Sequence, residues 1–398
     1  MRVFLFFITL LGGFNAGMCF ATAPLRVLNT YNRDGIANMM QQFSAQTGIE
    51  VQIEYIDQEE LKATVLKRME LHKAPDMLIM PADHVGMFKF MKYSAFKKSI
   101  FKANVPASTW EMGITEGKLY AAPIVQGTHL VLFYNKGLVS HPAQNWHEMG
   151  RQQLTFNASG VTTILWQQAS PYWFLPFLDA FGGWPMNNGK IELNTPAMVA
   201  AINYYDKLGE QFLPRALCNN DCIFQAFKAR KVAYIISGAW DSKLLFNELG
   251  DQLGVAPLPE ANGKPMRSPF STYVVAFPDN SLEGIKRAAL IELTNYLQST
   301  AVQKQLWEKL GAIPVEPNAI AYAKKNSKGY AIDILNQLKY TRPLPSDSAM
   351  SFSWEPIQKG LARHRENALD AENAAQYMQK LAERNVKNAA AEADTKVP

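Results

Sequence analysis

Hydrophobic residues in the first eighty positions follow two alternating periods. Residues 25–30, 49–56 and 77–80 carry apolar side chains in short continuous or every-second-residue runs, which predicts β-strands. Between them, residues 34–48 and 61–71 repeat their apolar side chains every three or four positions, which predicts helices packed by one face. This strand–helix–strand–helix–strand order predicts a parallel sheet with right-handed crossovers.

Polar segments follow two of the predicted strands. Residues 30–33 (Thr-Tyr-Asn-Arg) come after the first strand, and residues 81–84 (Pro-Ala-Asp-His) come after the third. Ligands of open parallel sheets bind beyond the carboxyl ends of the strands. Neither segment has the glycine pattern of a dinucleotide or P-loop site. Both are candidate ligand-binding loops, with ordinary polar loops as the alternative.

The rest of the chain predicts a second α/β unit. Residues 119–135 are rich in strand-forming side chains around Gly127, where the chain could pass from one unit to the other. There is no internal repeat and no long linker, so several short crossings would join the two units. Helices are expected over 171–180, 196–209, 223–230, 283–297, 300–310 and 354–388, strands over 231–237, 254–258 and 271–277, and a loose tail over 389–398.

The N-terminus has the order of a secretory signal peptide. Arg2 precedes an apolar run over residues 3–11, which is too short to span a bilayer. Ala21 and Ala23 offer cleavage sites, and Ala21 is favoured because a proline follows Ala23. Cys19 follows a bulky methionine where a lipoprotein signal needs a small residue, so a lipid anchor is the disfavoured alternative. We therefore expect a signal peptide over residues 1–21, ending at 23 at the latest, and a mature chain in the periplasm.

Composition narrows the class of function. The 398 residues include 40 Lys and Arg against 35 Asp and Glu, a net charge of +5, and the charges are interspersed. No basic run of the kind that follows a phosphate backbone is present, so nucleic acid is not an expected partner. The six histidines show no metal-ligand spacing and no catalytic motif appears, so we expect no metal, no cofactor and no enzyme. An exported glycoside hydrolase stays open as an alternative, because it needs only two carboxylates.

Two cysteines remain after the signal peptide. Cys218 and Cys222 are separated by three residues, and an even pair in an oxidising compartment predicts a disulfide. Two free thiols are the alternative. The closed loop would be very small, so the bond would stabilise the fold little.

Six segments resemble the maltose and maltodextrin-binding branch of the bacterial extracellular solute-binding proteins. They occur in the order and spacing of that family across almost the whole mature chain. They are residues 43–51 (Phe-Ser-Ala-Gln-Thr-Gly-Ile-Glu-Val), 74–77 (Ala-Pro-Asp-Met), 117–120 (Gly-Lys-Leu-Tyr) before Pro123, 133–136 (Phe-Tyr-Asn-Lys) before Trp146, 237–240 (Ser-Gly-Ala-Trp) and 310–314 (Leu-Gly-Ala-Ile-Pro).

The resemblance implies a two-lobed α/β periplasmic-binding-protein fold of type II, with a mainly parallel sheet flanked by helices in each lobe and a ligand cleft between them. Residues 24–125 plus 275–312 would form the N-terminal lobe, and residues 128–270 plus 313–371 the C-terminal lobe. Gly127 would then lie at a hinge. The family role is to bind a carbohydrate such as a maltodextrin and deliver it, as a monomer, to the permease subunits of an ABC importer at the inner membrane.

The resemblance also implies a set of sugar-binding residues. Asp83 matches an aspartate that binds sugar hydroxyls, and Tyr172, Trp240 and Trp354 match aromatic residues that stack on sugar rings. Tyr31, Asn32, His84 and Glu355 are secondary candidates, whereas Trp166, Trp173, Trp184 and Trp307 are expected in the core.

This chain departs from the family at several contact positions, so the resemblance supports the carbohydrate class more strongly than maltodextrin itself. The family has an arginine at His84, a tryptophan at Met80, an acidic residue at Thr30 and a glutamate at Gly127 or Thr128.

The chemistry of such a site is simple. Aromatic rings cover the apolar faces of a sugar ring, and carboxylates and amides bind its hydroxyl edges. Because a fold does not determine its ligand, a polyamine, a metal chelate or a phosphorylated polyol are alternatives. A purely structural or adhesive protein, which would not need separated aromatics around a cleft, is a further one.

Overall fold

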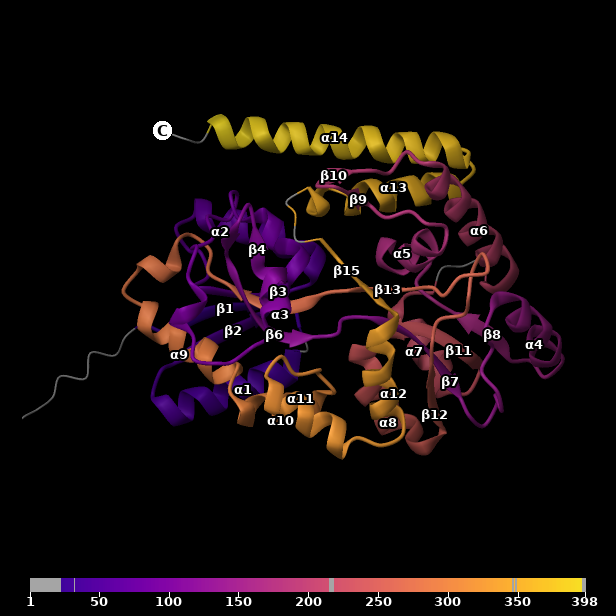
Figure 1. Ribbon diagram of the computed structural model, residues 1–398, viewed down its shortest axis with the longest axis horizontal. Helices are drawn as coiled ribbons and strands as arrows, with labels where there is room; N and C mark the ends of the chain where they lie inside the picture. Colours follow the sequence, from indigo (N-terminus) through magenta and orange to yellow (C-terminus); the bar gives the residue numbers. More distant parts are fainter. Residues whose placement is uncertain (1–22, 32, 215–217, 346, 348, 396–398) are drawn as a thin grey trace, which may run out of the picture.

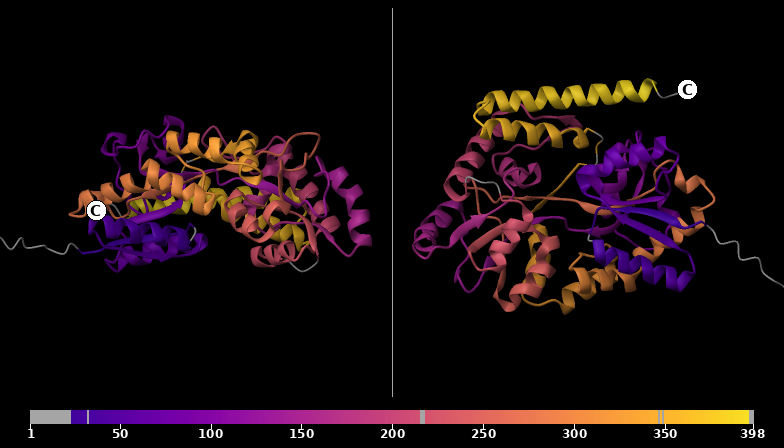
Figure 2. Two further views of the ribbon diagram at one scale, coloured as in Figure 1. Left: turned by 90° about the horizontal axis from the view of Figure 1, so that it is seen from below. Right: turned by 180° about the vertical axis from the view of Figure 1, so that it is seen from behind.

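The computed structural model describes residues 23–31, 33–214, 218–345, 347 and 349–395. Two units, each built on one sheet with helices around it, lie side by side in Figures 1 and 2. The signal peptide and the candidate residue Asn32 lie outside the described residues. This is the expected two-lobed α/β fold.

The first sheet has the strand order β2-β1-β3-β14-β6. Its strands are β1 (Leu25–Asn29), β2 (Val51–Tyr55), β3 (Met77–Pro81), β6 (Ala121–Gln126) and β14 (Thr272–Ala276). β1 pairs in parallel with β2 and β3, as the alternating periods predicted, because the helices between these strands return the chain to the same end of the sheet. β14 is antiparallel to both of its neighbours.

The second sheet has the order β12-β7-β11-β8. Its strands are β7 (Leu130–Asn135), β8 (Thr162–Leu165), β11 (Val232–Gly238) and β12 (Leu253–Ala256), and β7 is antiparallel to both neighbours. In each sheet all strands but one run in the same direction, as the expectation of mainly parallel sheets requires. The one reversed strand, β14 in the first sheet and β7 in the second, pairs antiparallel with both neighbours, so both sheets are mixed. In each sheet the reversed strand is the one by which the chain arrives from the other lobe.

The helices surround these sheets. They are α1 (Arg33–Thr47), α2 (Leu61–Glu70), α3 (Ala107–Trp110), α4 (Trp146–Ala158), α5 (Pro171–Ala180), α6 (Pro196–Phe212), α7 (Asn220–Lys228), α8 (Ser242–Leu249), α9 (Arg287–Leu297), α10 (Thr300–Leu310), α11 (Pro317–Asn326), α12 (Tyr330–Gln337), α13 (Trp354–Arg365) and α14 (Ala371–Thr395). Short paired strands complete the fold: β4 (Ile114–Thr115), β5 (Lys118–Leu119), β9 (Met186–Asn187), β10 (Lys190–Ile191), β13 (Ser268–Phe270) and β15 (Thr341–Pro343).

Crossing segments join the two lobes and contact one another. Gln126 forms an antiparallel bridge with Ile313, and the Thr128 amide donates to the Ser271 carbonyl. Gly127 has a φ of +83°, and a Cβ atom there would lie 2.5 Å from Cδ1 of Ile313. The positive φ therefore favours glycine at this position, and a side chain there would also have to displace the end of the Ile313 side chain.

The apolar cores follow the two sheets. Core residues of the first lobe come from 25–125 and 274–315, and most of those of the second come from 130–266 and 313–382. Trp307 on α10 packs against the second core, so this helix contacts both lobes. We propose the lobe boundaries expected from the sequence, 24–125 plus 275–312 and 128–270 plus 313–371, with α14 added to the second lobe.

The C-terminal part differs from the expectation in two ways. The predicted helix 354–388 is broken between α13 and α14, where Asn367 adopts a φ of +56° and the Asp370 carboxylate accepts a hydrogen bond from the Asn373 amide. The predicted loose tail over 389–398 is helical as far as Thr395. Alanine has the highest helix propensity, which favours continuing the helix through this alanine-rich end. Residues 396–398 lie outside the described part.

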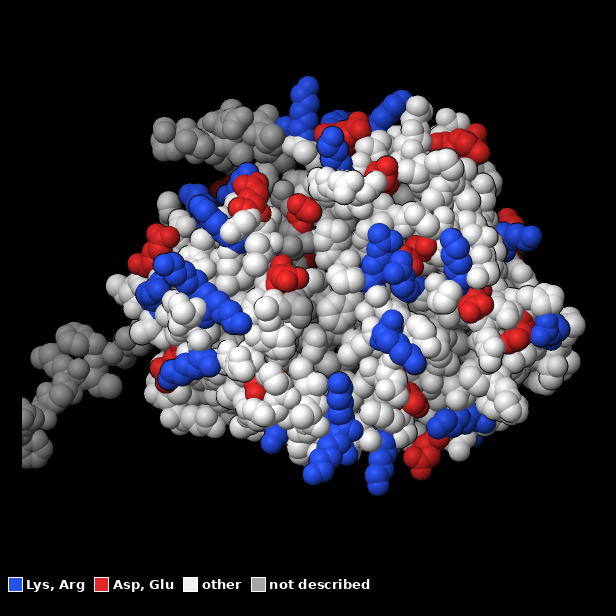
Figure 3. Space-filling model, in the orientation of Figure 1, with Lys and Arg blue, Asp and Glu red and all other residues white. Residues whose placement is uncertain are grey.

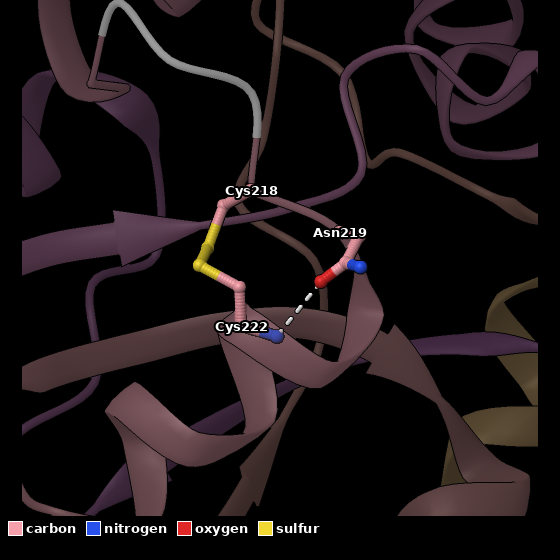
Figure 4. The surroundings of a disulfide bond; sticks show 3 residues. All are labelled: Cys218, Asn219 and Cys222. Carbon is pink, nitrogen blue, oxygen red and sulfur yellow. Dashed lines mark hydrogen bonds between the residues drawn. A yellow bond between two sulfur atoms is a disulfide. The ribbon is translucent and has the colours of Figure 1, made fainter.

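A disulfide joins Cys218 and Cys222 at the beginning of α7, with 5.4 Å between their Cα atoms (Figure 4). The side-chain oxygen of Asn219 accepts a hydrogen bond from the Cys222 amide at 2.9 Å, which caps the same helix end. The bond adds a local restraint to one helix terminus.

Candidate ligand-binding site

Both candidate loops of the first lobe lie where the strand pattern placed them, at the carboxyl ends of β1 and β3. Tyr31 follows β1, and Asp83 belongs to a 3₁₀ helix, η2 (Ala82–Met87), that follows β3. The buried Asn29 side chain holds the first loop, because its Oδ1 accepts from the Tyr31 amide and its Nδ2 donates to the Tyr31 carbonyl. Tyr31 and Asp83 are each 6% exposed, and Tyr31 belongs to the core of the first lobe.

The second lobe contributes an aromatic cluster, which we define as Tyr172, Trp240 and Trp354. They come from the first turn of α5, from η5 (Ala239–Asp241) after β11, and from the beginning of α13. The Tyr172 ring centroid lies 6.2 Å from each of the two tryptophan rings. The three rings that the resemblance singled out therefore meet, although they are far apart in the sequence.

Local contacts hold these rings in place. The Tyr172 hydroxyl donates to the Thr128 carbonyl and lies 3.2 Å from the Pro269 carbonyl, both next to the crossing segments. Trp240 lies against the backbone of Gly238, where a Cβ atom would lie 2.0 Å from the indole ring. Trp240 also packs against the cores of both lobes. Tyr172 is thus attached to the segments that cross between the lobes, and Trp240 contacts the cores of both.

One hydrogen bond connects the lobes directly at the site. The Trp354 indole Nε1 donates to Oδ2 of Asp83 at 3.1 Å. Further contacts between η2 and a second 3₁₀ helix, η9 (Met350–Phe352), accompany it, and the Phe90 and Phe352 rings meet edge to face at 6.3 Å. The lobes are therefore in a closed arrangement.

Two residues of this region were not predicted as site residues. Asp241 follows Trp240, accepts a 2.6 Å hydrogen bond from Ser237, and has its pKa raised to about 6 by burial. Tyr273 on β14 packs its ring 4.5 Å from that of Tyr31. Burial raises the pKa of the Tyr31 phenol, and the charge of Asp241 raises it further. The position of Asp241 beside a candidate tryptophan was the available signal, whereas the strand periodicity around Tyr273 carried none.

A cavity of about 470 Å³ opens between the lobes beside this cluster. Asp83, His84, Trp354 and Glu355 line it, whereas Tyr31, Tyr172 and Trp240 do not. The other lining residues are Gln58, Lys62, Met87, Phe90, Ser351, Phe352, Gln358, Asn385 and Asn388. We define the inner group as Tyr31, Asp83, Tyr172, Trp240 and Trp354. Two of its members, Asp83 and Trp354, also form part of the wall of the outer cavity.

The secondary candidates differ in their surroundings. His84 is half-buried, with Nε2 3.3 Å from Nε2 of Gln58. Glu355 is exposed, and its pKa is lowered by Lys359 and, less, by Asn385, which both donate to it. Of the tryptophans expected in the core, Trp166, Trp184, Trp307 and Trp173 are buried, and the ring of Trp173 also lies 6.3 Å from that of Trp240.

Three further features of the described residues bear on function: the charge distribution, the possible metal ligands and the hydropathy of the helices. Positive and negative side chains are intermingled on the face shown in Figure 3, without a stripe of one sign. Among the described residues, no group of three or more His, Cys, Asp or Glu side chains is placed to hold a metal ion. The same part of the chain contains no helix with the length and apolar character needed to cross a membrane.

Comparison with known proteins identifies the family. Residues 38–332, about three quarters of the chain, match the family model of the bacterial extracellular solute-binding proteins. The chain belongs to this family. As a solute-binding protein it is the ligand-capturing component of an ABC importer, acts outside the cytoplasm and is not an enzyme.

Relatives of this solute-binding protein are named for maltodextrin-type ligands. A maltooligosaccharide ABC transporter solute-binding lipoprotein of Streptococcus pneumoniae is 26% identical over 320 residues, 76% of this chain and 74% of the relative. The maltodextrin-binding protein MdxE of Bacillus subtilis is 23% identical over 300 residues, 71% of this chain and 70% of the relative.

Solved structures match the fold over nearly the whole chain. The maltose/maltodextrin-binding domain MalE from Bdellovibrio bacteriovorus, bound to maltotriose, superposes with a TM-score of 0.83 at 22% identity and covers 92% of this chain and 100% of its own. MalX from Streptococcus pneumoniae, in complex with maltopentaose, has a TM-score of 0.79 at 22% identity and covers 90% of this chain and 100% of its own. At this level of identity the likeness defines the fold.

Proposed function

We propose that this solute-binding protein captures a maltodextrin-like oligosaccharide between its lobes in the periplasm and delivers it, as a monomer, to the permease subunits at the inner membrane. The observation that supports this most is the meeting of Tyr172, Trp240 and Trp354 beside the buried carboxylate of Asp83. The names of the relatives point to the same ligand class.

The inner group has the chemistry that a sugar ring needs. Indole and phenol rings cover the C–H face of a sugar and remove apolar area from water. The carboxylate of Asp83 accepts hydrogen bonds from hydroxyls, each worth about 1.5–3 kcal/mol when the acceptor is charged. In this role Asp83 would exchange the indole of Trp354 for a sugar hydroxyl, while Tyr31, Asn32, His84 and Glu355 would bind other hydroxyls.

Where this chain departs from the maltodextrin-binding pattern, we expect different side chains to contact the sugar, and we expect the ligand to remain an oligosaccharide. Met80, which stands where the family has a stacking tryptophan, is fully buried in the core of the first lobe and cannot face a sugar. His84 replaces an arginine but still lines the cavity, where an imidazole can donate or accept one hydrogen bond. Stacking therefore falls mainly to the aromatic cluster of the second lobe.

A cationic solute such as a polyamine is the second candidate. Asp83 accepts a hydrogen bond from Trp354, and Asp241 directly follows Trp240, so both carboxyls lie near the same set of rings. Carboxylates among aromatic rings also suit an ammonium group. Although burial raises the pKa of Asp241 to about 6, this carboxyl is still mostly ionised near pH 7, so the polyamine alternative is tested together with the sugars.

A thermal-shift screen separates the candidates. Maltose, maltotriose, trehalose, a glycerol phosphate and spermidine would be added to the mature protein, because a ligand that binds only the folded state raises its melting temperature. We expect maltotriose to raise it, with a stabilisation of about 2.7 kcal/mol at a hundredfold excess over Kd. A shift with spermidine alone would replace the oligosaccharide proposal with the polyamine one.

A further inference from the structure

The C-terminal helix α14 is anchored to the second lobe by one stripe of its surface. Ala374, Met378 and Leu381 on this stripe are buried, and the helix packs against α13 and α6. Figures 1 and 2 show the helix continuing from there across the gap toward α2 of the first lobe. The far end of α14 therefore lies over the space between the lobes.

The same stripe becomes polar where the helix leaves the core. Asn385 and Asn388 follow Leu381 at spacings of four and three residues, so they continue the face that is apolar in the preceding turns. Both line the 470 Å³ cavity. Asn385 is half-buried, and its Nδ2 donates to Oε2 of Glu355 at 3.2 Å. The helix face is thus apolar where it packs on the core of the second lobe, and it carries carboxamide side chains where it faces the cavity.

Carboxamides also reach the cavity from the other sides. Gln58 comes from the segment before α2 in the first lobe, and Gln358 comes from α13 in the second. A carboxamide donates and accepts, as a sugar hydroxyl does, so four such groups can bind hydroxyls without a net charge. Asp83 and Trp354 line this cavity as well, so it is continuous with the inner group. Its volume lies within the usual range of about 300–1,000 Å³ for ligand pockets.

We infer that α14 is a third wall of the ligand site, and that Asn385 and Asn388 bind the hydroxyls of a sugar unit beyond those held by the inner group. This inference rests on the proposed function. According to this inference, α14, which packs on α13 and α6 of the second lobe, determines which oligosaccharide lengths are bound. A longer oligosaccharide gains contacts with α14 that a short one cannot reach.

The test is calorimetric titration of the mature protein with maltose, maltotriose, maltotetraose and maltopentaose. The test variant is Asn385→Ala/Asn388→Ala, since alanine preserves the helix. The matched control is Gln376→Ala, which removes an exposed carboxamide from the anchored half of the same helix. Thermal melting of each variant checks that the fold is retained.

We expect the double variant to bind the longest ligand about tenfold more weakly, a change of roughly 1.4 kcal/mol, while the shortest ligand that binds changes less than twofold. The control should match the wild type at every length. If the wild type binds the series and the double variant keeps the same length preference, or loses all lengths equally, the role of α14 is refuted and the proposed function stands. If the wild type binds no member of the series, the proposed function itself fails.

Discussion

The hydrogen bond between Trp354 and Asp83 offers a direct test of the closed arrangement. It joins η2 of the first lobe to α13 of the second, and so it can form only when the lobes are closed. Trp354→Phe keeps an aromatic ring but removes the indole donor. The Asp83 side chain, 6% exposed, then loses the hydrogen bond that the structure gives it. A charged hydrogen bond is worth about 1.5–3 kcal/mol, so the closed-to-open ratio should fall by roughly 10- to 150-fold.

Small-angle X-ray scattering of the unliganded protein measures this change. Opening separates the lobes, so we expect a larger radius of gyration for Trp354→Phe than for the wild type. Trp184→Phe is the matched control, because Trp184 is buried within the second lobe under Arg342 rather than between the lobes. An unchanged scattering profile for Trp354→Phe, or an equal change in the control, would contradict the role assigned to this bond.

Three further predictions concern the aromatic cluster, a buried carboxylate and a buried histidine. Trp240→Ala should weaken oligosaccharide binding at least tenfold in a fluorescence titration, and unchanged affinity would remove Trp240 from the site. Asp179, whose side chain is 2% exposed, accepts hydrogen bonds from Arg267 and Arg342, so Asp179→Asn should lower the free energy of unfolding in urea by about 2–3 kcal/mol, and a loss below about 0.5 kcal/mol would refute this. Burial lowers the pKa of His129 from 6.5 to about 4, so the unfolded chain binds this proton in a pH range where the folded chain does not. The free energy of unfolding should therefore fall by about 3 kcal/mol as pH drops from about 6.5 to about 4, and His129→Gln should abolish that part of the slope.

The sequence predicted correctly those helices and strand pairings that are determined by residues close together in the chain. The proline and the periodic apolar residues at the beginning of α5 predicted the bounds that the helix has in the structure. The predicted end of α10 is also correct, because Gly311 after it adopts a left-handed conformation that ends the helix. The parallel pairing of β1 with its two neighbours followed from the alternation of periods. In these cases the information lies within a few residues of the element.

Features that depend on distant segments escaped prediction. The reversed strands β7 and β14 look like any other apolar run, because nothing in their own residues specifies an antiparallel neighbour. Asp241 comes near Tyr31 only because the lobes close, and Tyr273 joins the site because β14 is inserted into the first sheet from a distant part of the chain. Asn385 joins the cavity because α14 extends beyond the lobe to which it is anchored. The resemblance supplied the aromatic cluster because it carried information about spatial neighbours that periodicity lacks.

The position of β14 within the first sheet has a consequence for how the protein is made. This strand lies between β3 and β6, yet its residues 272–276 are synthesised only after those of the second sheet. Pairing Tyr273 with Val125 closes a loop of nearly 150 residues, and such distant pairings slow folding because the loop entropy must be lost first. The nascent N-terminal part therefore has no complete sheet to form while most of the chain is still emerging. For a protein that acts outside the cytoplasm, such a delay would favour export, because a chain that has not yet folded can pass through a narrow membrane channel.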